Sequence, residues 1–332
     1  MVETIRVHGF PHAYELSEPT DSPTVLVFVH GWLLSRAYWQ PVIERLSPRF
    51  QCLSYDLRGF GESQLKVSEE QSVALSERAS ERAIASRSPQ EVAIAPKTSL
   101  SSPSSRTSVE LAISESLYSP SAYAQDLNSL LSSLNITRAW LIGHSLGGAI
   151  ALWAADQNQK TILGVICINA GGGIYVKKEF EKFRAAGQQI IKFRPRWLAS
   201  MPPLNLLLSE ALAHMSVAQP LSRFWGKQRL LDLLTAQPEA AIGALLESTT
   251  ETEVHLLPQV VARLQQPVHF IAGINDTVME PKYVRHLASF HPSFECCGSN
   301  VNQIADCGHL AMLEQPEAVA DEICRILTVH QA

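Results

Sequence analysis

The segment Gly143-His-Ser-Leu-Gly-Gly148 decides the fold of this 332-residue chain, because of what stands on either side of it. The apolar run 139–142 before it predicts a buried strand, and residues 146–156 carry apolar side chains at helical spacing. A serine between glycines at a tight strand-to-helix turn is typical of a nucleophile elbow, where a strained backbone exposes the hydroxyl. The context therefore predicts Ser145 as a nucleophile.

Short apolar runs alternate with helical patterns from about residue 24 to the end. This alternation predicts an α/β fold with a mostly parallel, doubly wound sheet. The other strands of this sheet are near-continuous apolar runs, as expected when helices cover both faces, at 24–30, 50–55, 162–168, 267–272 and 300–305. Further helices are predicted at 37–46, 121–134, 281–290 and 316–327. Residues 2–8 and 12–17 predict an antiparallel pair at the sheet edge.

Two segments depart from this alternation. Residues 64–119 are rich in serine and lack glycine and aromatic residues before Tyr118, so they cannot bury enough apolar surface to offset their ordering entropy. We expect a disordered insertion, either a tolerated surface loop or a docking arm. Residues 174–258 contain only helical patterns and predict a helical cap, inserted between a first part of the core at 1–173 and a second part at 259–332.

Composition excludes several function classes. A hydrophobic content of 46% supports a sizeable core, and a formal net charge of -5 lacks the basic excess that nucleic-acid binding requires. The N-terminus lacks a cationic stretch followed by an apolar run, and no apolar run approaches the roughly 18 residues of a membrane helix, so we expect a cytoplasmic protein. The cysteines lack metal-ligand spacing and are expected to be free thiols: Cys52, Cys167, Cys296, Cys297, Cys307 and Cys324.

Outside the serine-rich insertion, the chain resembles the α/β-hydrolase superfamily. Its motifs occur in the family's order, each after a predicted strand: His30-Gly31-Trp32, Asp56-Leu-Arg58-Gly59-Phe-Gly61-Glu-Ser63, Gly143-His-Ser-Leu-Gly-Gly148, Gly273-Ile-Asn-Asp276 and Gly308-His309. The resemblance implies an α/β-hydrolase fold with a cap and a nucleophile, acid and base in that chain order. We expect His30 and Gly31 to shape their turn, and Asp56 with Arg58 to brace theirs.

Ser145, His309 and Asp276 are the predicted catalytic residues. A serine hydroxyl is a poor nucleophile until an imidazole removes its proton, and the imidazole needs a carboxylate to fix its tautomer. All three residues follow predicted parallel strands, and open α/β sheets gather their sites at the carboxyl ends of such strands. Asp306 is a competing acid, but it lies at the end of the strand that carries His309 and is more simply structural. The strand before the cap ends in Asn169-Ala170, which offers no carboxylate.

The substrate contacts are predicted more coarsely. The resemblance assigns the oxyanion hole to the backbone N–H groups of Trp32 and Leu146. The aromatic and leucine content of the cap indicates an apolar cavity, although much of it must also pack the cap onto the core. The side chains expected to contact substrate are Trp32, His144, Phe193, Trp197, Phe224 and Trp225.

The resulting functional hypothesis is a serine hydrolase that cleaves a carboxylic ester or thioester with an apolar acyl or alcohol group. A carbon-carbon hydrolase, a pyruvate-eliminating synthase and a perhydrolase would use the same three residues, and a non-catalytic ligand-binding module is a further alternative. Dehalogenase and epoxide hydrolase chemistry is disfavoured, because such relatives place an aspartate where this chain has Ser145. A cationic run at 177–196 is either a solvated face or a surface that attracts an anionic substrate or lipid, which would make peripheral lipid contact possible. We expect no metal, organic cofactor, nucleic acid or integral membrane segment.

Overall fold

The computed structural model describes residues 1–65, 117–174, 176–194, 201–294 and 300–331. Nearly all of the predicted insertion lies outside the described residues, as do Trp197 and the neighbours Cys296 and Cys297. The four described cysteines are free thiols: Cys52, Cys167, Cys307 and Cys324. Within these ranges, no helix is both long enough and apolar enough to cross a bilayer.

Eight strands form one sheet in the order β1-β2-β4-β3-β5-β6-β7-β8. The strands are β1 (Glu3–Val7), β2 (Phe10–Leu16), β3 (Val25–Val29), β4 (Gln51–Tyr55), β5 (Ala139–His144), β6 (Ile162–Ile168), β7 (Val268–Gly273) and β8 (Val301–Ile304). β1 pairs with β2 and β2 with β4 in antiparallel register, and the other five pairs are parallel. The predicted α/β fold with a mostly parallel sheet is confirmed. Because β3 lies between β4 and β5, the strand order reverses there, which is where such sheets bind ligands.

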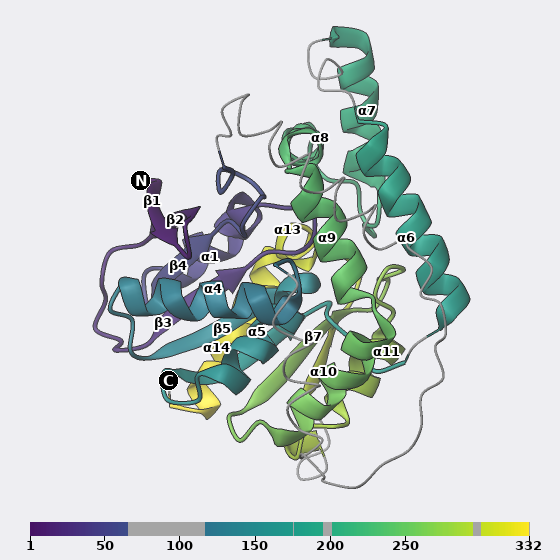
Figure 1. The fold of residues 1–332 in the computed structure, drawn as a ribbon. Helices are drawn as coiled ribbons and strands as arrows, with labels where there is room; N and C mark the ends of the chain where they lie inside the picture. The colour runs from purple at the N-terminus through teal and green to yellow at the C-terminus, as the bar shows by residue number, and fades with distance from the viewer. Residues whose placement is uncertain (66–116, 175, 195–200, 295–299, 332) are drawn as a thin grey trace, which may run out of the picture. The chain divides into compact units, whose positions relative to one another are not determined.

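Helices cover both faces of this sheet, and alternate strand residues enter two separate cores (Figure 1). On β3, Val27 faces the core formed with α4 (Pro120–Ser133), α5 (Leu146–Gln157), α10 (Glu251–Arg263) and α11 (Pro281–Ala288). Its neighbour Phe28 faces the opposite core, formed with η1 (Arg36–Trp39), α1 (Gln40–Leu46), α13 (Ala311–Glu314) and α14 (Pro316–Val329). This two-sided burial explains why the strands are apolar without alternation.

Local signals fix where several helices begin. Proline stands in the first turn of α4, α11 and α14, where its missing N–H costs no helical hydrogen bond. Ser119 caps α4 by accepting a hydrogen bond from Ala122 N at 3.2 Å, and Thr250 caps α10 in the same way from Glu253 N at 3.0 Å.

Among the described residues between β6 and β7, where the sequence predicts a cap, five helices are present: α6 (Lys177–Lys192), α7 (Pro202–His214), α8 (Arg223–Thr235), α9 (Pro238–Ser248) and α10. The expected boundary at residue 258 lies inside α10, which continues to Arg263 with Pro258 in its interior. Leu257 and Val261 of this helix pack into the core beside α5, and Arg263 pairs with Asp156 of α5. The second half of α10 therefore covers the sheet.

Candidate active site

Ser145 stands at a strained turn between β5 and α5. Its backbone has φ 52° and ψ -119°, in a region that costs a non-glycine residue about 1 to 3 kcal/mol. The flanking glycines make this turn possible. A Cβ on Gly143 would lie 2.2 Å from the carbonyl oxygen of Gly147, and one on Gly147 would lie 2.2 Å from that of Val29. The geometry is that of the predicted elbow.

The same close packing brings the start of α5 against the loop that follows β3. Leu146 is the first residue of α5, so its N–H is one of those that a helix leaves without an intrahelical acceptor. Gly31, which precedes Trp32, lies so close to His144 that a Cβ there would be 2.7 Å from the imidazole Nδ1. The two backbone segments predicted to form an oxyanion hole therefore both pack around the elbow.

His309 and Asp276 are in direct contact. His309 Nδ1 donates to Asp276 Oδ2 at 2.8 Å, and the Asp276 side chain is fully buried. The second carboxylate oxygen accepts hydrogen bonds from Val278 N at 2.8 Å and Met279 N at 2.9 Å. Because a carboxylate only accepts, this contact places the hydrogen on Nδ1 and leaves a lone pair on Nε2, as a base requires. The competing Asp306 is exposed.

His309 lies beside the elbow. Its ring centroid is 4.8 Å from that of His144, the residue before Ser145, and His144 Nε2 donates to the carbonyl oxygen of His309 at 2.7 Å. Among the hydrogen bonds of the described ranges there is none between Ser145 and His309, a contact that often tightens only when substrate binds.

His144 is buried, with 1% of its surface exposed, and its Nε2 is bonded to the backbone of His309. Burial holds the pKa of this imidazole well below its ordinary value, and the neighbouring His309 adds to the effect. A neutral ring with its hydrogen on Nε2 fits the bond to the His309 carbonyl. The Nε2 edge of His144 thus faces the His309 loop, and its contact with substrate stays a prediction.

Asn169 connects the loops that carry Asp276 and His309, a role that the sequence analysis missed. It directly follows β6 with a left-handed backbone (φ 47°), and it is fully buried. Its Nδ2 donates to the carbonyl oxygens of Gly308 at 2.8 Å and His309 at 2.9 Å, and its Oδ1 accepts from Gly273 N at 2.7 Å. One amide thus holds the loops of Asp276 and His309 together. The sequence marked only the position, as an asparagine after the strand before the predicted cap where this chain has no carboxylate, and not the loops that it joins.

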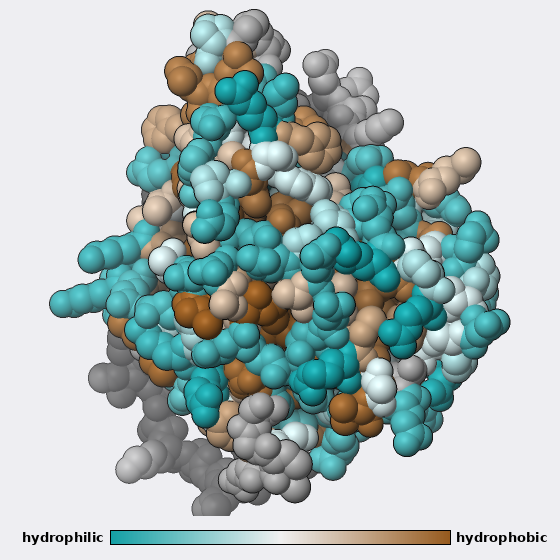
Figure 2. Space-filling view, turned by 180° about the vertical axis from the view of Figure 1, so that it is seen from behind, coloured by the Kyte–Doolittle hydropathy of each residue, from teal (hydrophilic) through white to brown (hydrophobic). Residues whose placement is uncertain are grey.

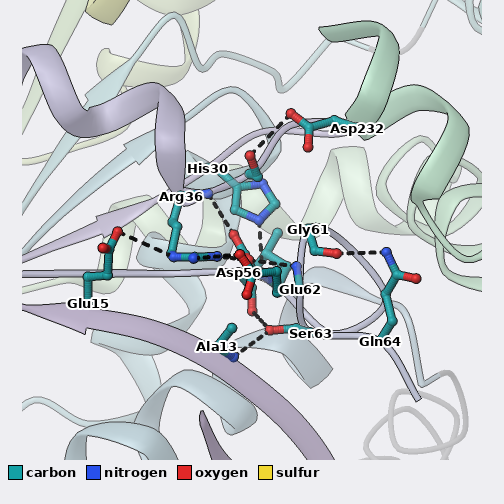
Figure 3. Close-up of polar contacts among 12 residues, drawn as sticks. Ala13, Glu15, His30, Arg36, Asp56, Gly61, Glu62, Ser63, Gln64 and Asp232 are labelled. Atoms are coloured by element: carbon teal, nitrogen blue, oxygen red, sulfur yellow. Dashed lines mark hydrogen bonds and ion pairs between the residues drawn. The ribbon is translucent and has the colours of Figure 1, made fainter. Parts of the chain in front are cut away.

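A buried polar network braces the loops after β3 and β4 (Figure 3). Asp56 accepts hydrogen bonds from Arg36 N at 2.7 Å and Glu62 N at 2.8 Å, and it pairs with the Arg36 guanidinium. His30 accepts from Leu57 N at 2.9 Å through Nε2. Burial lowers the pKa of His30, which favours the neutral ring that this bond needs. These contacts agree with the expectation that Asp56 and His30 shape their loops.

Comparison with known families agrees with this architecture. A model of the alpha/beta hydrolase fold matches residues 24–316, which is well over half of the chain. The chain belongs to the alpha/beta hydrolase fold family. The matched range begins at β3 and includes the elbow, the Asp276 loop and the His309 loop.

Individual relatives of this alpha/beta hydrolase are distant. An uncharacterized protein of Mycobacterium bovis is 25% identical over 332 residues, covering 97% of this chain and 79% of that protein. A 2-succinyl-6-hydroxy-2,4-cyclohexadiene-1-carboxylate synthase of Salmonella arizonae is 24% identical over 216 residues, covering 61% of this chain and 73% of the synthase. The solved structure of a thermophilic esterase from Thermogutta terrifontis matches with a TM-score of 0.66 and 21% identity, covering 99% of this chain and 98% of the esterase.

The aromatic residues expected to contact substrate differ in their surroundings in this alpha/beta hydrolase: two of them pack against other parts of the chain, and two are exposed. Trp32 reaches into the cap region, where its Nε1 donates to the carbonyl oxygen of Ala241 at 2.8 Å, and Trp225 packs near Tyr38 of η1 with 5.5 Å between ring centroids. Phe193 and Phe224 are 68% and 65% exposed. Both side chains are therefore largely exposed to solvent, and their contact with substrate stays a prediction.

Proposed function

We propose that this alpha/beta hydrolase is a serine hydrolase of carboxylic esters or thioesters, with Ser145 as nucleophile, His309 as base and Asp276 as acid. The observation that carries the proposal is the 2.8 Å contact between Asp276 and His309, beside the strained turn of Ser145. The chain order and the strand ends that hold these residues support the same roles.

The proposed reaction has two halves. In the first, Ser145 Oγ bonds to the acyl carbon while its proton passes to His309 Nε2, and the resulting oxyanion is held by the N–H groups of Trp32 and Leu146. The alcohol or thiol then leaves with the proton from His309. In the second, His309 removes a proton from water, the hydroxide oxygen attacks the acyl carbon, and Ser145 recovers its hydrogen as the acid is released. The Asp276 carboxylate stabilises the imidazolium in both halves.

The first prediction concerns the nucleophile. Hydrolysis of 4-nitrophenyl butyrate should fall on the order of 10⁶-fold in turnover for Ser145→Ala, and by a similar factor for His309→Ala, because the two residues act as a unit. Ser132→Ala, at an exposed serine of α4, is the matched control and should keep full turnover. Full activity in the Ser145 variant would refute the assignment.

We further propose that the helices between β6 and β7 cap the site and select an apolar acyl or alcohol group. The indole of Trp32 contacts α6 near Gly187 and is bonded to Ala241 of α9, so a residue of the proposed oxyanion hole also carries an aromatic ring into this group of helices. A panel of nitrophenyl esters and acyl thioesters of graded chain length, with Ser145→Ala as the blank, would define the bond and the size of the pocket. Equal kcat/KM for all lengths would contradict an apolar pocket.

The similarity to a synthase favours one second candidate, carbon-carbon chemistry or elimination on the same three residues. That relative is named 2-succinyl-6-hydroxy-2,4-cyclohexadiene-1-carboxylate synthase, and it covers less than two thirds of this chain. Covalent labelling of Ser145 by a fluorophosphonate without turnover of any ester or thioester would favour this candidate. Absence of both labelling and turnover would favour a non-catalytic ligand-binding protein.

A peripheral contact with anionic lipid is also part of the proposal. Exposed apolar side chains gather on α7 and α8, and Figure 2 shows apolar surface over α7 at the top of the view. A hollow between the two helices is lined by Leu206, Leu207, Ser209, Glu210, Arg223 and Lys227. Residues 177–235 contain ten Lys and Arg against four Asp and Glu, a formal charge of +6 in a chain whose total is -5. Each cation at an anionic surface contributes about 1 kcal/mol.

The lipid prediction is tested with vesicles of phosphatidylcholine, with and without phosphatidylglycerol. The chain should co-sediment with the anionic vesicles, and added salt should weaken this binding because it screens charge. Leu207→Ser/Lys227→Glu should abolish binding while leaving turnover of soluble esters unchanged. Val329→Ser/Lys160→Glu, at exposed positions on α14 and before β6, is the matched control. Equal sedimentation of the two double variants would contradict lipid contact through α7 and α8.

A further inference from the structure

The loop that carries His309 is joined to a segment between α7 and α8, residues 216–218. His309 N donates to the carbonyl oxygen of Ser216 at 2.9 Å. The two backbones run so close together that a Cβ on Gly308 would lie 2.6 Å from Ala218 N and 2.8 Å from Val217 Cα. Only glycine fits there without a shift of backbone, so this contact is built into the chain at position 308.

Glu314, at the end of the short helix α13, holds both segments with one carboxylate. Its Oε2 accepts hydrogen bonds from Gly308 N at 2.8 Å and Ala218 N at 2.7 Å, and its Oε1 accepts from Leu310 N at 2.9 Å. Two of these donors flank His309, and the third belongs to residues 216–218. Three donors facing an acceptor-only group form a complementary, charge-assisted cluster, which is stronger than a set of neutral bonds.

We propose that Glu314 is a positioning residue for the base: by binding residues 216–218 and the 308–310 loop at once, it fixes His309 against Asp276. The inference rests on the proposed serine-hydrolase function. Glu314 touches the backbone of the loop and not the ring of His309, so its effect on the reaction passes through geometry. Misplacing a reacting group by about 1 Å can lower the rate about 100-fold. Loss of the Glu314 contacts should therefore lower turnover.

The substitution that tests this is Glu314→Gln in the full chain. An amide keeps the size of the side chain, but its NH₂ group faces an N–H donor where the carboxylate accepted a hydrogen bond. We expect kcat for 4-nitrophenyl butyrate to fall between about tenfold and 100-fold while KM stays within about twofold, and the pH profile of kcat/KM to shift because the pairing of His309 with Asp276 loosens. Rates are expressed per site titrated with fluorophosphonate, which removes the effect of unfolded protein.

Two further variants complete the design. Glu317→Gln makes the same chemical change three residues later, at an exposed side chain that pairs with Arg45, and should leave kcat, KM and the pH profile as they are. Gly308→Ala pushes residues 216–218 off the loop without altering Glu314, and it should lower kcat in the same way. Both changes break the same contact, that between residues 216–218 and the 308–310 loop. Their effects on kcat should therefore be less than additive when combined. Gly308→Ala also carries the test if Glu314→Gln does not fold.

The outcomes separate this inference from the function on which it rests. A Glu314→Gln variant with a lower melting temperature but unchanged kcat, KM and pH profile per titrated site would overturn the positioning role. If the unmodified chain neither hydrolyses esters nor reacts with fluorophosphonate, the hydrolase proposal fails, and hydrogen exchange still tests the anchor. Backbone amides of 216–218 and 308–310 should then exchange faster in Glu314→Gln, and unchanged exchange would overturn the anchor as well.

Discussion

At the scale of single residues, the geometry of the site also rests on buried side chains that hold the loops of Asp276 and His309 in place. Asn169 illustrates this. Asparagine tolerates a left-handed backbone better than most residues. Its amide offers both hydrogen-bond donors and an acceptor, so it can bind the carbonyl oxygens of one loop and an N–H group of the other. An aspartate at this position would leave two carbonyl groups facing a negative charge.

Replacing Asn169 by alanine should weaken both stability and turnover. The change leaves buried groups of Gly273, Gly308 and His309 without that partner, at a cost of about 1 to 3 kcal/mol in the free energy of unfolding. Asn135→Ala is the matched control, because Asn135 has a similar backbone (φ 56°) but is exposed. Chemical denaturation of the two variants separates the hydrogen bonds from the backbone strain. Equal losses of unfolding free energy in both variants would show that the hydrogen bonds of the Asn169 side chain contribute nothing to stability.

At the scale of helices and strands, the region between β6 and β7 is tied to the core through the loop after β3. Trp32 donates to α9 through its indole, and its ring lies 6.2 Å from that of Phe183 on α6. A few residues further on, Ser35 Oγ donates to Asp232 of α8 at 3.1 Å. The loop at residues 32–35, which carries the proposed oxyanion donor Trp32, therefore contacts three of these helices. If the helices move away from the sheet, the loop loses these contacts.

The indole bond can be tested alone. Trp32→Phe keeps an aromatic ring but removes the donor to Ala241, with a net loss of about 1 kcal/mol. Hydrogen exchange of α6 and α9 amides should become about fivefold faster as these helices open more often. In Trp153→Phe, which removes the indole bond to Glu253 Oε1 of α10, the faster exchange should appear in α10 instead. The same pattern in both variants would refute a specific link through Trp32.

At the scale of the whole molecule, the sequence predicted the sheet and the elbow well, because both rest on local signals. The apolar runs that predicted strands match the observed strands to within a residue or two, and the glycines around Ser145 are explained by close backbone contacts. The sequence could not show which aromatic residues face outward, as Phe193 and Phe224 do, because exposure depends on how helices pack. It also could not reveal Asn169 or Glu314 as anchors, because their partners are backbone groups of distant loops.

Two buried carboxyl groups should make the stability of the chain depend on pH. Burial raises the pKa of Asp232 and of Glu253 to about 7, above their ordinary values near 4. A raised pKa in the folded state means that the stabilising effect of the protonated form is complete below about pH 4 and is lost as pH rises to about 7. Each group changes the free energy of unfolding by at most about 1.4 kcal/mol per pH unit.

The matching experiment compares Asp232→Asn/Glu253→Gln with the unmodified chain by denaturation at several pH values. The stability of the unmodified chain relative to the variant should fall between pH 4 and 7. Taking the difference removes the opposite effect of buried histidines such as His144, whose lowered pKa costs stability as pH falls. Asp21→Asn/Glu18→Gln, at exposed positions, should show no such trend. A constant difference across this range would show that neither carboxyl group titrates with folding.

The close passage of residues 216–218 over Gly308 has a consequence for protein engineering. A chimera that receives the helices between β6 and β7 from a distant family member would normally be spliced at the end of β6 and the start of β7. Such a splice would replace the backbone that binds the His309 loop, and a donor whose backbone follows a different path there would leave His309 misplaced. A graft that keeps residues 215–221 of the recipient, and exchanges the helices on either side of them, avoids this failure.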